Sequence, residues 1–144
     1  MFRPALRAQL SQGDVFRGIT IHDRAGPPRS ATVGVLSHDC EIDKPGERSR
    51  YLLVVEIRSP ADAGMSNWGN IRSNEAWNAL YIPAGPNIPE GYADLGRIHR
   101  IEKAALEQAM TNGHRIASMT DDGREALVYA LTSFFLHEDV APPP

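Results

Sequence analysis

The chain has 144 residues, of which 42% are hydrophobic and 23% charged, and its formal net charge is -3. This length fits one domain with its own core, so we expect residues 1–144 to form a single domain with a flexible tail at 139–144. The small net charge argues against a nucleic-acid binder that depends on overall charge, and the single cysteine excludes an internal disulfide. Apolar runs are too short for a membrane span or a signal peptide, so we expect a cytoplasmic protein without membrane contact.

Five segments rich in β-branched and aromatic residues predict strands. They are residues 15–21, 31 to about 38, 51–57, 78–82 and 92–101. The second and third are apolar on both faces in their middle, which is typical of buried central strands. The connection over residues 59–75 is long for a compact domain, and connections of this length often carry function.

Two helices are expected after the strands. Residues 102–110 have high helix propensity and precede Asn112-Gly113, which is typical of a helix end. A second helix is expected from about Thr120, because apolar residues recur there at helical spacing. Strands followed by helices favour an antiparallel α+β domain. Five short strands close most economically into a small barrel, which leaves no exposed edge.

A cluster of reactive residue types follows the second strand: Ser37, His38, Asp39, Cys40, Glu41 and Asp43. On a strand His38 and Cys40 would project to one face, where the imidazole can promote a thiolate. The carboxylates of Asp39 and Glu41 disfavour a second negative charge, and free cysteines are often buried. A reactive thiol, a structural thiol and a zinc site therefore stay open for Cys40, and the acidic row is either a site or a solvated strand end.

Arginines and aromatic residues in the loops offer a site for an anionic ligand. The arginines are Arg24, Arg29, Arg48, Arg50, Arg58 and Arg72, and the aromatics are Trp68, Trp77 and Tyr81. Guanidinium groups bind phosphate bidentately, and aromatic rings stack on unpaired bases. A solvated rim with aromatics in the core is the alternative interpretation of the same residues.

Three stretches resemble the PemK/MazF-like family, the toxins of bacterial toxin–antitoxin pairs. Residues 13–16 resemble its opening strand, and Arg29 followed by residues 33–37 resembles its arginine and the apolar strand ending in Leu-Ser. Residues 93–103 resemble its late segment leading into a helix. The resemblance implies an SH3-like barrel, often dimeric, and metal-independent cleavage of single-stranded RNA. It places the catalytic arginine at Arg29 and a polar site residue at Ser59 or Arg58.

We therefore predict a five-stranded antiparallel SH3-like barrel with two C-terminal helices, which binds or cleaves single-stranded RNA as a homodimer without a cofactor or metal. An antitoxin-like protein is a candidate partner. In the catalytic version Arg29 stabilises the pentavalent phosphate, and His38 accepts the proton of the ribose 2′-hydroxyl. The catalytic candidates are Arg29, His38, Cys40, Arg58 and Ser59, and the ligand-binding candidates are Asp39, Glu41, Arg50, Trp68 and Arg72.

Two other functions remain open from the sequence. The first is a non-catalytic barrel that uses the same face for a protein or small ligand, because a fold does not fix a function. The second is a thiol- or metal-dependent enzyme centred on Cys40.

Overall fold

The computed structural model describes residues 1–45 and 50–139, so Arg48 and all but the first residue of the expected tail at 139–144 lie outside the described part. Within these ranges six strands form one antiparallel sheet in the order β4-β5-β3-β2-β1-β6. The strands are β1 (Asp14–Ile21), β2 (Arg29–Val35), β3 (Tyr51–Arg58), β4 (Ala79–Ile82), β5 (Gly91–Glu102) and β6 (Arg115–Ser118). The helices are α1 (Asp39–Ile42), α2 (Pro60–Ala63), α3 (Met65–Arg72), α4 (Lys103–Thr111) and α5 (Asp121–Asp139).

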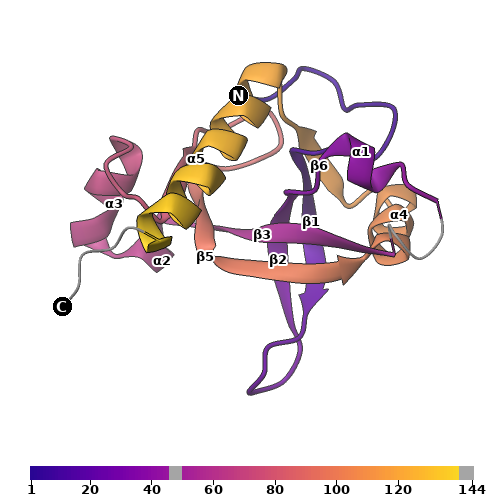
Figure 1. Cartoon of the computed structure of the whole chain (residues 1–144), viewed down its shortest axis with the longest axis horizontal. Coiled ribbons are helices and arrows are strands. Elements are labelled where there is room, and N and C mark those ends of the chain that lie inside the picture. The colour runs from indigo at the N-terminus through magenta and orange to yellow at the C-terminus, as the bar shows by residue number, and fades with distance from the viewer. Residues whose placement is uncertain (46–49, 140–144) are drawn as a thin grey trace.

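The sheet is strongly curled and open. The strands β3 and β5 run across β1 and β2, so the sheet forms about half of a barrel (Figure 1). Register shifts between Phe16 and Ile19 and between Val55 and Glu56 mark β-bulges, which increase strand twist. The antiparallel α+β class expected from the sequence is confirmed. The sixth strand, β6, was not expected; it pairs with the first three residues of β1 and lies between α4 and α5.

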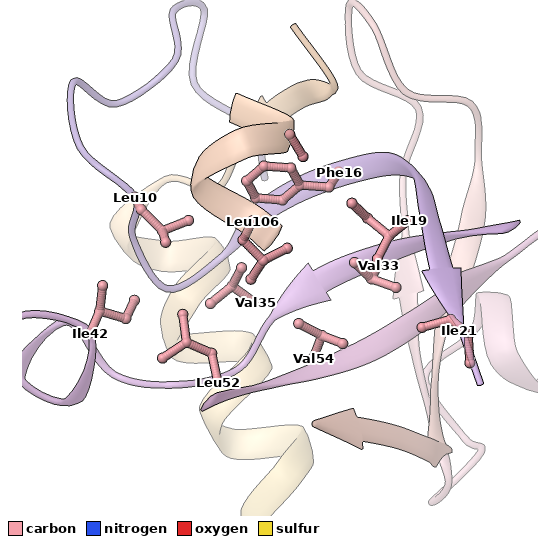
Figure 2. Packing of buried hydrophobic residues seen from close by; sticks show 11 residues of the cluster. Leu10, Phe16, Ile19, Ile21, Val33, Val35, Ile42, Leu52, Val54 and Leu106 are labelled. Atoms are coloured by element: carbon pink, nitrogen blue, oxygen red, sulfur yellow. The ribbon is translucent and has the colours of Figure 1, made fainter. Parts of the chain in front are cut away.

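Hydrophobic residues pack on both faces of the sheet. Leu52 and Val54 of β3 point to one face, where Leu106 of α4 covers them (Figure 2). We call this side the α4 face. Val55 points to the opposite face and joins a second cluster with Leu127 of α5. Successive side chains of β3 thus point to opposite faces and belong to two different hydrophobic cores, which explains why its sequence is apolar at consecutive positions.

The segment after β2 differs from the expected strand end. β2 ends at Val35, and the four residues Asp39–Ile42 form α1. His38 caps this helix, since its Nδ1 accepts a hydrogen bond from the backbone N–H of Cys40 at 3.1 Å. The expectation that His38 and Cys40 share a strand face is therefore wrong. In a helix, residues two positions apart do not face one another.

A buried carboxylate fixes the start of β1. The Asp14 side chain is fully buried, and it accepts hydrogen bonds from Ser11 N at 2.9 Å, Arg115 Nη1 at 2.9 Å and Ser118 Oγ at 2.6 Å. These bonds join the lead-in segment, β1 and β6, so the Gly-Asp motif of the sequence has a structural role. Within the described ranges, none of the helices is both long enough and apolar enough to cross a membrane.

Candidate functional site

Glu56 is a charged residue in the middle of an otherwise apolar strand. It is 2% exposed and follows Val54 on the α4 face of β3. A buried carboxylate is costly unless positive or hydrogen-bonding groups surround it, so its neighbours define a candidate site.

Arg29 and His99 both bind the Glu56 carboxylate. Arg29 Nη1 donates to Oε2 at 3.1 Å, and Arg29 Nη2 bonds Oε1. His99 Nε2 lies 2.7 Å from the same Oε1. Asp23 completes the group, because it accepts from Arg29 Nε at 2.6 Å. We call these four residues the Glu56 cluster.

Strand register explains why these distant residues meet. His99 of β5 lies directly opposite Val54, and Arg29 of β2 lies opposite Ile21 of β1. Directly opposed residues in an antiparallel ladder point to the same side, and residues two apart on a strand also share a side. Arg29, Glu56 and His99 therefore converge on the α4 face from three neighbouring strands, and Asp23 reaches them from the β1–β2 hairpin loop.

Charge pairing controls protonation in the cluster. Burial by itself would raise the pKa of Glu56, but the hydrogen bonds from Arg29 and His99 outweigh it and hold that pKa below its usual value. The hydrogen bond from Arg29 likewise lowers the pKa of Asp23. The two carboxylates, Glu56 foremost, raise the pKa of Arg29. Both carboxylates therefore stay ionised to a lower pH than free carboxyl groups do.

Asp23, Glu56 and His99 also have the residue types of a cation site. One ligand atom from each can be chosen so that all lie within 4.8 Å of one another. Arg29, however, bonds both carboxylates, so its guanidinium already supplies the positive charge that a metal ion would bring. A metal would have to displace Arg29, and the residues present therefore fit an arginine-centred site better than a metal centre.

The cluster can position a base and a cation for phosphate chemistry. A carboxylate only accepts hydrogen bonds, so His99 must carry its proton on Nε2, which leaves the lone pair of Nδ1 available as a proton acceptor. Arg29 uses Nε, both N–H groups of Nη2 and one N–H of Nη1 on Asp23 and Glu56, which leaves one Nη1 N–H for another ligand.

Arg58 and Ser59 lie at the end of β3, beyond this cluster. Arg58 Nη1 lies 3.5 Å from an oxygen of Asp94, and the backbone N–H and hydroxyl of Ser59 donate to Asp62 at 3.2 and 3.1 Å. Asp94 is opposite Glu56 in the ladder, so Arg58 belongs to the same face as the cluster. Ser59 mainly fixes the start of α2.

The candidates around α1 lie at the other end of β2 from Arg29. β2 spans seven residues, about 20 Å of extended strand, and Figure 1 shows α1 and the β1–β2 hairpin loop at opposite ends of the hairpin. Asp39 accepts from Gln12 N and from Arg124 Nη2, each at 2.8 Å, so it ties α1 to the lead-in segment and to α5. Partial burial opposes these bonds, but they prevail and lower the pKa of Asp39.

His38 and Cys40 are both exposed, and Glu41 pairs with Lys44 at 2.8 Å. The geometry therefore does not unite His38 with Arg29 in one site.

The remaining ligand-binding candidates are dispersed. The Arg50 guanidinium lies 5.4 Å from the ring centroid of Tyr51. Trp68 packs against Tyr81 and Tyr92 in a small hydrophobic cluster under α3, so it serves the core. Arg72 is largely exposed and lies 3.8 Å from Glu90.

Three cluster members, Asp23, Glu56 and His99, were not predicted as site residues. A glutamate inside an apolar strand was the available signal, because such a carboxylate needs a buried partner. The identities of its partners Arg29 and His99 depend on the pairing of β3 with β2 and with β5, which the sequence does not show. No family model matches the chain, and no curated protein matches it.

Proposed function

We propose that the chain is a PemK/MazF-like protein that binds or cleaves single-stranded RNA at the Glu56 cluster. The half-barrel is then a variant of the SH3-like barrel in which β6 is added at one edge and α4 and α5 cover the two faces. The observation that carries the proposal is that a guanidinium and an imidazole are fixed on one buried carboxylate. In this arrangement a guanidinium that can bind phosphate lies beside an imidazole that can accept a proton.

The cleavage step follows from these groups. The 2′-oxygen attacks the adjacent phosphorus and gives its proton to His99 Nδ1, while Arg29 stabilises the charge of the pentavalent phosphate. The bond from phosphorus to the 5′-oxygen breaks, and water protonates that oxygen. The products are a 2′,3′-cyclic phosphate and a 5′-hydroxyl, and no metal is required. His99 replaces His38 as the proposed base because only His99 lies beside Arg29.

A binding role without cleavage has one specific observation in its favour. Asp23 and Glu56 already occupy most of the N–H groups of Arg29, so a phosphate has to displace Asp23 or accept the single remaining donor. Asp23 is exposed on the hairpin loop, which makes that exchange feasible. The same cluster then serves as an anion-binding site of an inactive barrel.

Cleavage of a single-stranded RNA pool in the presence of a metal chelator tests the proposal. Wild-type protein should produce 2′,3′-cyclic phosphate ends, whereas Arg29→Ala and His99→Ala should lose activity by about a hundredfold or more. Arg24→Ala is the matched control, because Arg24 lies exposed in the same hairpin loop outside the cluster. Binding without cleavage supports the second role. If the protein neither binds nor cleaves the RNA, both roles are contradicted.

The proposal extends to assembly and location. It includes a homodimer, a protein partner of the antitoxin kind and a cytoplasmic location, as expected for a PemK/MazF-like protein. Sedimentation of the purified chain tests the dimer directly, and a single monomeric species at micromolar concentration would contradict it.

A further inference from the structure

A cavity of about 450 Å³ lies where the half-barrel fails to close. It is lined by Gly18–Thr20 of β1, Arg100–Glu102 of β5 and the side of α4. Side chains alternate along a strand, so a cavity lined by three consecutive residues looks onto the strand edge. We call it the seam cavity.

Among the residues that the structure describes, neither strand edge has a partner strand at this point. The pairing of β1 with β6 ends at Phe16, and the pairing of β5 with β4 extends from Gly91 to Asp94 and no further. The helix α4 packs between the two edges, because Leu106 and Ala109 belong to the cluster that contains Ile19 of β1 and against which Ile101 of β5 packs. The space that an added strand would need is therefore filled by α4, which favours a small flat ligand over an extended peptide.

The lining combines an apolar floor with flat and hydrogen-bonding side chains. Ile19, Ile101 and Ala109 supply the floor. Tyr51 and Arg100 belong to the face of the sheet opposite to this floor and reach the cavity at the edge of β5. There the Arg100 guanidinium lies over the Tyr51 ring, 4.3 Å from its centroid. A planar ring can extend such a stack.

Two carboxamides at the rim can recognise the edge of a ring. Gln108 Nε2 donates to Asn112 Oδ1 at 3.4 Å. This bond leaves the Gln108 oxygen as an acceptor and the Asn112 amide group as a donor, next to one another at the C-terminal end of α4. A donor beside an acceptor is the pattern that pairs with the edges of nucleobases.

The seam cavity lies beside the Glu56 cluster. Ile101 at its floor and His99 in the cluster are two residues apart on β5 and share the α4 face, about 7 Å from one another. His22 at the rim directly precedes Asp23 on the hairpin. A chain bound at Arg29 can therefore place a neighbouring group in the cavity.

We infer that the seam cavity binds one unpaired base of an RNA strand whose phosphate lies at Arg29. This inference rests on the proposed function and deepens it, because it assigns base selection to Tyr51, Arg100, Gln108 and Asn112. The volume lies within the range of small-ligand pockets, and stacking plus an amide pair is a usual means of reading a single-stranded base.

Binding of four labelled homo-oligonucleotides, one for each base, tests the inference by fluorescence anisotropy. Wild-type protein should prefer one base. Ala105→Phe places a ring in the cavity from an exposed position of α4, and it should weaken the preferred oligonucleotide by about tenfold and level the four affinities. Combined Gln108→Ala and Asn112→Ala should relax the preference without filling the cavity.

Two further variants separate base binding from phosphate binding. Arg29→Ala should weaken all four oligonucleotides by a similar factor, because a phosphate contact carries no sequence information. Thr111→Ala, exposed on α4 outside the cavity, should behave as wild type. If wild-type protein binds RNA and Ala105→Phe binds each of the four oligonucleotides as tightly as wild-type protein does, the inference is wrong while the proposed function stands. If wild-type protein binds none of them, both fail.

Discussion

The Arg29 guanidinium bonds both oxygens of the Glu56 carboxylate, although Glu56 is 2% exposed and sits in an apolar strand. The pair joins the first residue of β2 to the middle of β3. It converts a costly buried charge into a fixed charged pair on the α4 face. The geometry of this pair, more than any single residue type, makes this end of the sheet the candidate site.

Glu56→Gln should destabilise the protein by about 2 kcal/mol, because it removes charge-assisted hydrogen bonds from a buried position. The free energy of unfolding in urea measures the effect. Asp23→Asn is the matched control, since Asp23 binds the same guanidinium from the exposed hairpin loop and should change stability much less. Equal destabilisation by the two variants would contradict a special role of burial at Glu56.

The protein should be less stable in acid, because the Glu56 carboxylate becomes protonated there. The pKa of Glu56 is below its usual value of 4.5 in the folded state, so the unfolded chain binds protons first as the pH drops. The stabilisation is complete well above pH 4.5 and is lost as the pH falls through the lower folded pKa. The free energy of unfolding should therefore decline as the pH falls below about 5, and less steeply in Glu56→Gln. If the free energy of unfolding falls equally steeply with pH in wild-type protein and in Glu56→Gln, protonation of Glu56 is not the cause of the loss.

Much of the fold is predictable from local pattern, as β3 shows. Residues 51–57 are apolar with β-branched side chains, and the structure places β3 at Tyr51–Arg58. The helix expected over 102–110 appears as α4 at Lys103–Thr111. These elements depend on short-range propensity and burial periodicity, which the sequence carries directly.

Elements that depend on distant partners could not be predicted. The four residues of β6 have no strong strand pattern, and they form a strand because Asp14, Val15 and Phe16 pair with them. The α1 helix likewise interrupts what would otherwise continue as a strand, and Asp39 is held there by Arg124 from α5. Arg29 was a site candidate through the family resemblance, and its contact with Glu56 depends on the pairing of β2 with β3, which the sequence does not show.

Asp14→Ala should be the most destabilising of the carboxylate substitutions, by about 3 kcal/mol or more. It leaves Arg115, whose side chain is 9% exposed, without its ion-pair partner, and it removes an acceptor from Ser118. Chemical denaturation checks the value. Asp121→Ala serves as control, because its side chain is 91% exposed and its pairing with Arg7 should contribute little. A loss for Asp14→Ala as small as that for Asp121→Ala would contradict the structural role of the buried network.

Two glycines should respond to alanine with opposite signs. Gly13 has a φ of 84°, and an added Cβ would lie 2.9 Å from Met119 Cβ, so Gly13→Ala should cost about 2 kcal/mol. Gly69 lies inside α3, where an added Cβ meets no atom within 4 Å. Gly69→Ala should therefore stabilise the protein by about 1 kcal/mol through helix propensity. Thermal unfolding of both variants checks the signs, and a destabilised Gly69→Ala would mean that α3 is not helical there.

Adjacent residues of α1 should separate a structural role from a chemical one. Cys40 is exposed, so Cys40→Ser should leave stability and any RNA cleavage unchanged. Asp39→Ala removes the acceptor of Gln12 N and Arg124 and should destabilise the protein by about 1 kcal/mol, because it frees α1 from α5. Urea unfolding and the cleavage assay applied to both variants provide the comparison. A folded Cys40→Ser protein that has lost activity would place the chemistry at the thiol and away from the Glu56 cluster.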